Sequence, residues 1–245
     1  MYILQLSDLH FPEEAATEKE RYKKITDRLI MAIKDTVPPD QRLLVAVCGD
    51  LVNQGHEEGL SHAKTILNRI RNELAAYEIQ FGFAPGNHDL IDGNLTDFNN
   101  FIVAYGEPQH CFKNSSCYHL SIEEIGVTTN VIFVNSVYSG NKDKGQVNYS
   151  DLSGLLQRLD PTAPKILVLH HTIISMDNTD TSSILNAAKL VELIDQYHIS
   201  MLLHGHTHGL DTVSIGNANC AVIGVGALFS RDYPDVNSQF NLIEI

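Results

Sequence analysis

The sequence predicts an α/β protein whose sheets are covered by helices on both faces. Three observations support this class. Short apolar runs alternate along the chain with amphipathic helical patterns. These runs are nearly continuous in Val, Ile and Leu, which is typical of strands buried on both sides. With 245 residues, 43% hydrophobic and 19% charged, the chain can bury a large core, and disorder is excluded as its main state.

Nine segments are expected to form strands. Six are apolar runs that match buried strands in length and composition. They are Tyr2–Ser7, Leu43–Cys48, Ile79–Ala84, Val131–Asn135, Lys165–Leu169 and Ile199–Leu203. Three shorter segments close the β structure after the last helix, namely Val213–Ile215, Ala221–Val225 and Phe240–Ile245.

Four helices are expected between the strands. Apolar positions spaced by three and four residues give each of the last three a single buried stripe, and Ser150 is a candidate N-cap. The polar stretch from Asp92 to Asn100 predicts a loop instead. The four segments are the basic run from Lys19 to Arg28, then Leu60–Tyr77, Asp151–Leu159 and Ser183–Tyr197.

We expect a single domain over residues 1–245, because the sequence contains no internal repeat, low-complexity tract or long linker. The chain ends on an apolar strand-like segment without a polar tail, which is what a domain cut from a longer protein would show.

Charge and cysteine content limit the partners and the location. Lys and Arg number 17 against 30 for Asp and Glu, so the net charge of −13 argues against long duplex nucleic acid or an anionic membrane as partner. No apolar run approaches the roughly 20 residues of a membrane span, and none predicts a secretory signal. The four cysteines form no CxxC pair. A cytoplasmic protein is therefore expected.

Polar motifs follow five of the predicted strands, where the chemistry of such sheets collects. Asp, His and Asn are ligands for divalent cations, and the D-x-H and H-x-H spacings turn both side chains of a pair to one side. Glycines in these motifs allow close backbone approach. The donors suffice for two divalent cations. The motifs are Asp8-Leu9-His10, Gly49-Asp50, Gly86-Asn87-His88-Asp89, His170-His171 and Gly205-His206-Thr207-His208.

In this order, the motifs resemble those of the calcineurin-like metallophosphoesterase superfamily. The resemblance spans positions 8 to 208, and it is specific because five blocks match in order. It implies a four-layer α/β/β/α sandwich with two metal ions at the edges of the sheets. The activity implied is hydrolysis of a phosphoric ester by a hydroxide that bridges the two ions.

The resemblance also implies a role for each residue. Asp50 bridges the ions and, with Asn87 and His88, takes part in catalysis. His88 faces the substrate phosphate and has no metal role, and Asp89 is expected to orient it. Manganese, iron, zinc and magnesium all suit these ligands. One ion is assigned Asp8, His10 and His208, and the other Asn87, His170 and His206.

The histidine motifs are similar to those of the bacterial class III cyclic-nucleotide phosphodiesterase branch. A cyclic nucleotide or another small phosphodiester is therefore the expected substrate. Thr172-Ile173 replaces the proline usual after the paired histidines, which leaves the substrate class open. The alternatives are a nuclease or a phosphomonoesterase on the same site, and a non-catalytic scaffold.

Two further groups of residues carry alternatives. His170 is favoured over His171 as the ligand because it directly follows the strand, which leaves His171 as a pocket residue. A zinc site is conceivable from two cysteines and two histidines, against the simpler alternative of buried or surface thiols. Its members would be His110, Cys111, Cys117 and His119.

Overall fold

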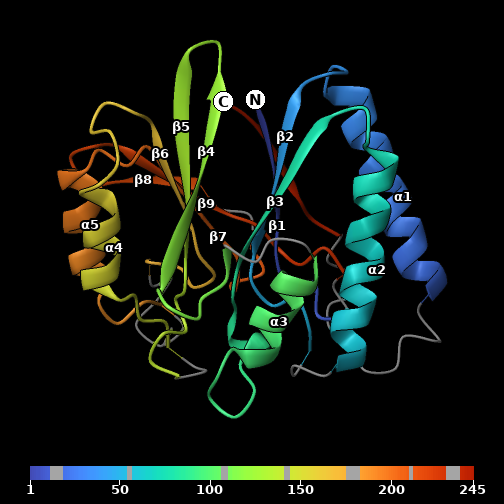
Figure 1. Cartoon of the computed structure of the whole chain (residues 1–245), viewed down its shortest axis with the longest axis horizontal. Helices are drawn as coiled ribbons and strands as arrows, with labels where there is room; N and C mark the ends of the chain where they lie inside the picture. The colour runs from blue at the N-terminus through green and yellow to red at the C-terminus, as the bar shows by residue number, and fades with distance from the viewer. Residues whose placement is uncertain are drawn as a thin grey trace.

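The computed structural model describes residues 1–11, 19–53, 57–105, 110–140, 144–174, 183–209, 212–229 and 238–245. Two sheets pack face to face, and helices cover their outer faces (Figure 1). This arrangement confirms the predicted four-layer sandwich.

The first sheet has the strand order β10-β1-β2-β3, and β1, β2 and β3 run parallel. The edge strand β10 pairs antiparallel to β1. The carboxyl ends of the three parallel strands therefore meet along one edge. The bounds are Tyr2–Leu6 for β1, Arg42–Cys48 for β2, Glu78–Ala84 for β3 and Asn241–Glu244 for β10.

The second sheet has the order β4-β5-β6-β7-β9-β8, with β5, β6, β7 and β9 parallel and both edge strands antiparallel to their neighbours. Parallel pairing again brings the carboxyl ends of β6 and β7 together. The bounds are Cys117–Glu124 (β4), Val127–Val134 (β5), Lys165–Val168 (β6), Met201–His204 (β7), Thr212–Ile215 (β8) and Cys220–Gly224 (β9).

The core between the sheets is apolar and closely packed. Ile3, Leu44, Phe133 and Leu203 lie in it, and all are buried. A Cβ atom at Gly82 would lie 2.0 Å from the Phe133 ring, so the absence of a side chain in β3 allows the sheets to approach at this point.

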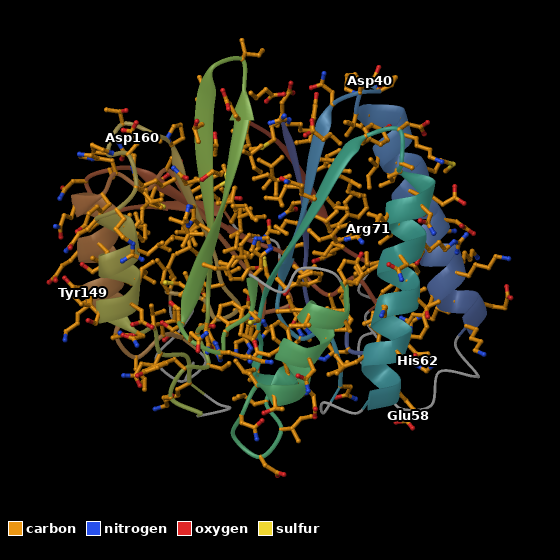
Figure 2. The ribbon with its side chains drawn as sticks, viewed as in Figure 1. Asp40, Glu58, His62, Arg71, Tyr149 and Asp160 are labelled. Atoms are coloured by element: carbon orange, nitrogen blue, oxygen red, sulfur yellow. The ribbon has the colours of Figure 1, made fainter. Side chains whose placement is uncertain are left out.

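The helices divide between the two outer faces. Helices α1 (Lys19–Thr36), α2 (Glu57–Glu73) and α3 (Thr96–Tyr105) cover the first sheet, and α4 (Tyr149–Leu156) and α5 (Ala187–Gln196) cover the second (Figure 1). The side chain of Arg71 in α2 (Figure 2) places its guanidinium 4.9 Å from the ring centre of Phe81 and 4.3 Å from that of Tyr105, which ties α2 to β3 and α3.

Three sequence predictions need correction. Part of the polar stretch expected to be a loop is helix α3, because Phe98, Phe101 and Tyr105 form a buried stripe between its polar residues. The N-cap of α4 is Asn148, whose side chain accepts from Asp151 N–H, and not Ser150, which lies inside the helix. Helix α5 begins at Ala187 and not at residue 183.

Within the described residues, every helix is too short or too polar to cross a membrane.

Candidate metal centre

The five motifs converge where the carboxyl ends of the two sheets meet. The loops after β1 and β2 run side by side: Asp8 N–H donates to Gly49 O at 3.1 Å, and His10 N–H donates to Asp50 O at 3.0 Å. A third hydrogen bond joins the two sheets. The backbone N–H of His206, which follows β7, donates to Oδ2 of Asp8, which follows β1, at 3.0 Å. Backbone hydrogen bonds thus hold the loops after β1 and β2 together and fix the Asp8 carboxylate against the loop after β7.

The first predicted ligand set is assembled in the structure. Asp8, His10 and His208 each offer an atom within 4.8 Å of the others. Asp8 Oδ1 lies 3.2 Å from His208 Nε2 and 3.7 Å from His10 Nε2. The two imidazoles are partly exposed, whereas the carboxylate is fully buried.

The second predicted ligand set surrounds His170. Its Nε2 atom lies 2.9 Å from Asn87 Oδ1, 3.0 Å from His206 Nδ1 and 3.4 Å from Asp50 Oδ2. Asp50 Oδ2 is also 3.9 Å from His10 Nε2, so this carboxylate stands between the two sets, as expected of a bridging ligand.

His88 lies closer to the ligands than its predicted role requires. It forms a third group with His10 and Asp50, again with one atom from each residue within 4.8 Å, and its ring centre is 4.9 Å from that of His10. Its backbone N–H donates to Asp50 Oδ1 at 2.9 Å. The position of its side chain suits either a ligand or a group that faces the substrate, and its assignment to the phosphate remains a prediction.

The surroundings of His170 fit a cation. His170 Nδ1–H donates to Cys48 O at 2.8 Å, so the neutral ring presents a lone pair at Nε2. That lone pair faces the oxygens of Asn87 and Asp50, which are themselves acceptors. A proton or a metal ion is needed there, and the mixture of carboxylate, imidazole and amide donors is typical of divalent transition metals. The residues present therefore fit a metal.

In the metal-free chain, the pKa shifts at this site reflect the same need for positive charge beside the carboxylates. Burial alone would lower the pKa of His170, but the charge and hydrogen bonding of Asp50 raise it to about 9. Burial would likewise raise the pKa of Asp8 and Asp50, yet the neighbouring histidines hold both below their usual value. Burial and the charge of His170 lower the pKa of His206 to about 4.

The backbone at this site is strained. Five of the seven predicted ligands adopt a positive φ, a region that residues other than glycine seldom occupy. Such conformations cost of order 1–3 kcal/mol each and persist where the surrounding structure enforces them, often at functional sites. The five are Asp8 (52°), His10 (45°), Asp50 (53°), His206 (68°) and His208 (53°).

Close backbone approach at three glycines confirms the role predicted for them. Gly49 has a φ of 92°, and a Cβ atom there would lie 2.6 Å from His170 Nδ1 and 2.8 Å from Gly86 N. Cβ atoms at Gly86 and Gly205 would lie within 2.7 Å of the Asp50 and Asp8 carboxylates respectively. Any side chain at these three positions would displace a predicted ligand.

Asp89 does not take the role expected from the sequence. Its buried carboxylate accepts from Leu51 N–H at 3.0 Å and from Gly86 N–H at 2.8 Å. It therefore joins the loops after β2 and β3, and among the described residues its hydrogen bonds are to these backbone groups and not to the His88 side chain. Burial and the charge of Asp50 raise the pKa of Asp89 to about 8.

Sequence reasoning missed Ser136, which follows β5. Its hydroxyl lies 2.9 Å from His171 Nδ1, and both residues are fully buried beside the predicted ligands. No local motif marks it; only its position after the carboxyl end of a parallel strand could have indicated it. The unusual Thr172 is buried and closes its own turn, because its Oγ1 accepts from Ile174 N–H at 3.2 Å.

The conceivable zinc site is not formed. All groups of described residues able to hold a metal lie at the strand ends, and none includes Cys111 or Cys117. Cys117 packs in the core outside the second sheet, whereas Cys111 packs against the core outside the first. His110 instead stacks on Tyr118, with ring centres 4.9 Å apart. His119 belongs to no such group either.

The fold and the site define a class of two-sheet sandwich proteins with a histidine- and carboxylate-rich centre, and comparisons with known proteins identify the family. A family model described as calcineurin-like phosphoesterase matches residues 1–210. The chain therefore belongs to this family of metal-dependent phosphoric ester hydrolases, which use a dinuclear metal site. No curated protein sequence matches the chain.

Solved structures share the fold at low sequence identity. A dimetal phosphatase from Danio rerio superposes with a TM-score of 0.68 at 9% identity, covering 99% of this chain and 91% of that one. A phosphopantetheinyl hydrolase from Mycobacterium tuberculosis gives 0.61 at 13% identity, with 98% and 95% covered. The inner membrane complex anchor of Plasmodium gives 0.57 at 14%, with 99% and 80% covered.

Proposed function

We propose that the protein is a phosphodiesterase that hydrolyses cyclic nucleotides or another small phosphodiester at the dinuclear site. Asp50 would bridge two divalent ions, Mn, Fe or Zn. The remaining ligands would be Asp8, His10 and His208 on one ion and Asn87, His170 and His206 on the other. The geometry of the first set and of the atoms around His170 supports this division.

The observation that carries the choice of a diester is that no Lys or Arg side chain among the described residues pairs with the carboxylates of the site. Among the described residues, every ion pair of Asp8 and Asp50 is made with a histidine. A phosphodiester carries one negative charge, whereas a phosphomonoester carries about −1.5 to −2 at neutral pH. The smaller charge of a diester makes a smaller demand on cationic side chains beyond the two metal ions.

The chain's own residues would bind and orient the ester. When bound, two divalent ions lower the pKa of water and hold the phosphoryl oxygens. Asn87 would place its amide beside the phosphorus, and the imidazole of His88 would donate a hydrogen bond or a proton to the leaving oxygen. The backbone N–H of His88 also donates to Asp50 Oδ1 at 2.9 Å, so the turn after β3 helps to hold the carboxylate that would bridge the ions.

The test is a comparison of substrates on the metal-loaded protein. Bis-p-nitrophenyl phosphate, p-nitrophenyl phosphate, cyclic AMP and single-stranded DNA would each be assayed with Mn, Fe or Zn. We expect the diester to be hydrolysed faster than the monoester, and cyclic AMP to be turned over. A monoester rate about tenfold higher with every metal would overturn the diester proposal, and a preference for DNA would identify a nuclease.

We also propose the cytoplasm as the location. All four cysteines are free thiols, as is usual in a reducing compartment.

A further inference from the structure

His171 is a buried imidazole beside the metal centre that the proposed ligand sets do not use. Its ring centre lies 4.5 Å from that of His206 and 5.1 Å from that of His170. The residue is fully buried, and its Nε2 atom has no hydrogen-bond partner among the described residues. An unpaired polar nitrogen at such a place calls for a physical reason.

Ser136 determines which nitrogen of His171 carries the hydrogen. The serine Oγ accepts from the backbone N–H of His171 at 3.3 Å and lies 2.9 Å from Nδ1 of the His171 ring. If Nδ1 were the donor, the hydroxyl would accept twice and its own hydrogen would be buried without an acceptor among the described residues, at a cost of about 1–3 kcal/mol, while Nε2 would also stay unpaired. The hydroxyl therefore donates to Nδ1, and in the neutral ring the hydrogen is on Nε2.

The ring is also held in place by its neighbours. A Cβ atom at Gly145 would lie 2.7 Å from His171 Cβ and Cγ and 3.0 Å from Nδ1, so the backbone at Gly145 packs directly against the imidazole. The orientation of Nε2–H is thus fixed by Ser136 on one side and by this backbone contact on another. A fixed buried donor next to an anion-binding centre loses little entropy when an acceptor arrives.

We propose that His171 donates its Nε2–H to an oxygen of the phosphoryl group held at the metal centre, and that Ser136 keeps it in this donor tautomer. His171 is then a catalytic residue that contacts the substrate, and Ser136 is a positioning residue. No proton is transferred in this role, because the hydrogen bond alone compensates phosphoryl charge. The inference rests on the proposed dinuclear site and holds for diester and monoester alike.

The tautomer is tested first, by 15N NMR of the histidine-labelled chain with and without zinc. We expect His171 Nδ1 to resonate as an unprotonated imidazole nitrogen and Nε2 as a protonated one, with the signals assigned by their loss in His171→Gln. Ser136→Ala should weaken this preference. A protonated Nδ1 in the unsubstituted chain would overturn the proposal.

The contact is tested by calorimetric titration of the zinc-loaded chain with inorganic phosphate. His171→Leu removes the donor and should weaken binding by about tenfold or more, whereas His171→Gln keeps an N–H donor and should recover most of that loss. Zinc content should stay unchanged in both variants. Loss of zinc in both would make His171 a ligand, and equal phosphate affinity in His171→Leu would exclude the contact; either result overturns the proposal.

Neither readout uses turnover. A chain that hydrolysed no diester but showed the expected tautomer and phosphate binding would overturn the proposed substrate while leaving the role of His171 intact.

Discussion

At the scale of single residues, the proposed metal centre is expected to depend most on Asp50. One of its oxygens lies 3.4 Å from His170 Nε2 and 3.9 Å from His10 Nε2, so it stands between the two ligand sets. Its second oxygen accepts from His88 N–H. A change at this carboxylate should therefore affect both ions, whereas a change at an outer ligand should affect one.

The first prediction compares Asp50→Asn with His10→Ala. The asparagine keeps the shape of the side chain and the acceptor for His88 N–H but removes the charge. Both ions should therefore bind at least about 10- to 100-fold more weakly, which is the loss typical of changing a residue that only supports a ligand. His10→Ala should weaken chiefly one ion. Metal content by elemental analysis after dialysis measures both effects, and His198→Ala, on an exposed residue, is the control. Retention of both ions in Asp50→Asn would contradict the bridging role.

The second prediction separates catalysis from metal binding at His88. His88→Asn should keep both ions and the fold while lowering kcat by about 10²–10⁴-fold, the range for a positioned acid–base group. The loss should be smaller for a p-nitrophenyl ester than for a poor leaving group, because p-nitrophenolate needs little protonation. Because His88 forms a group with His10 and Asp50, metal content must be measured too. Loss of an ion would show that His88 is a ligand.

The residue types at the site could be predicted because each motif directly follows a strand, and parallel pairing brings strand ends together. The backbone conformation of these residues could not be predicted. The positive φ of Asp8, Asp50 and His206 is imposed by contacts between loops distant in sequence, such as His206 N–H to Asp8 Oδ2. The partnership of Ser136 with His171 depends on the same kind of contact.

At the scale of elements, the centre is made by loops that pack against one another more tightly than side chains would allow. Gly49 illustrates this, since it combines a φ of 92° with close contacts to His170 and to the backbone of Gly86. Gly93 has a similar φ of 75°, but nothing lies within 4 Å of the Cβ atom that alanine would add. The two positions therefore separate backbone strain from steric conflict.

The third prediction uses this pair. Gly93→Ala should lower the free energy of unfolding by about 1–2 kcal/mol, because alanine disfavours the left-handed conformation. It should leave the metal content unchanged. Gly49→Ala should cost a further 1–3 kcal/mol or so through overpacking and should displace His170, weakening metal binding. Chemical denaturation and elemental analysis measure the two effects. Equal behaviour of the two variants would contradict the steric account.

The elements themselves show where sequence patterns are informative. The buried parallel strands could be predicted to within a few residues because they are short and almost wholly apolar, as in β2 and β6. Helix α3 could not be predicted, because Asp97, Asn99 and Asn100 lie next to the aromatic residues of its buried stripe and give the segment the composition of a loop. Its helical state depends on the packing of those aromatic residues against the first sheet.

At the scale of the whole molecule, a buried polar contact joins the two sheets. Gln5 of β1 donates from Nε2 to His204 O at 3.0 Å and to Ile223 O at 3.1 Å, both in the second sheet, and its Oε1 accepts from Asn241 Nδ2 at 2.9 Å. The contact lies at the ends of β7 and β9, close to the loop that carries His206. It fixes the sheets where the ligands meet.

The fourth prediction is that Gln5→Leu destabilises the protein by about 1–3 kcal/mol, because Asn241 and the two carbonyls lose a buried partner. Gln80→Leu, a matched change at an exposed glutamine in β3 of the same sheet, should change the free energy of unfolding by less than about 0.5 kcal/mol. Urea denaturation of the metal-free chains checks both. Similar values for the two variants would mean that the bridge contributes little.

The central claim is that one dinuclear centre is assembled from both sheets, with Asp8, Asp50 and Asn87 following strands of the first and His170 and His206 following strands of the second. Anomalous scattering from a crystal of the manganese-loaded protein tests it most directly. We predict two peaks about 3.5–4 Å apart, both in contact with the Asp50 carboxylate and each also in contact with residues from both sheets. A single peak in a fully active protein, or two peaks away from Asp50, would contradict the account.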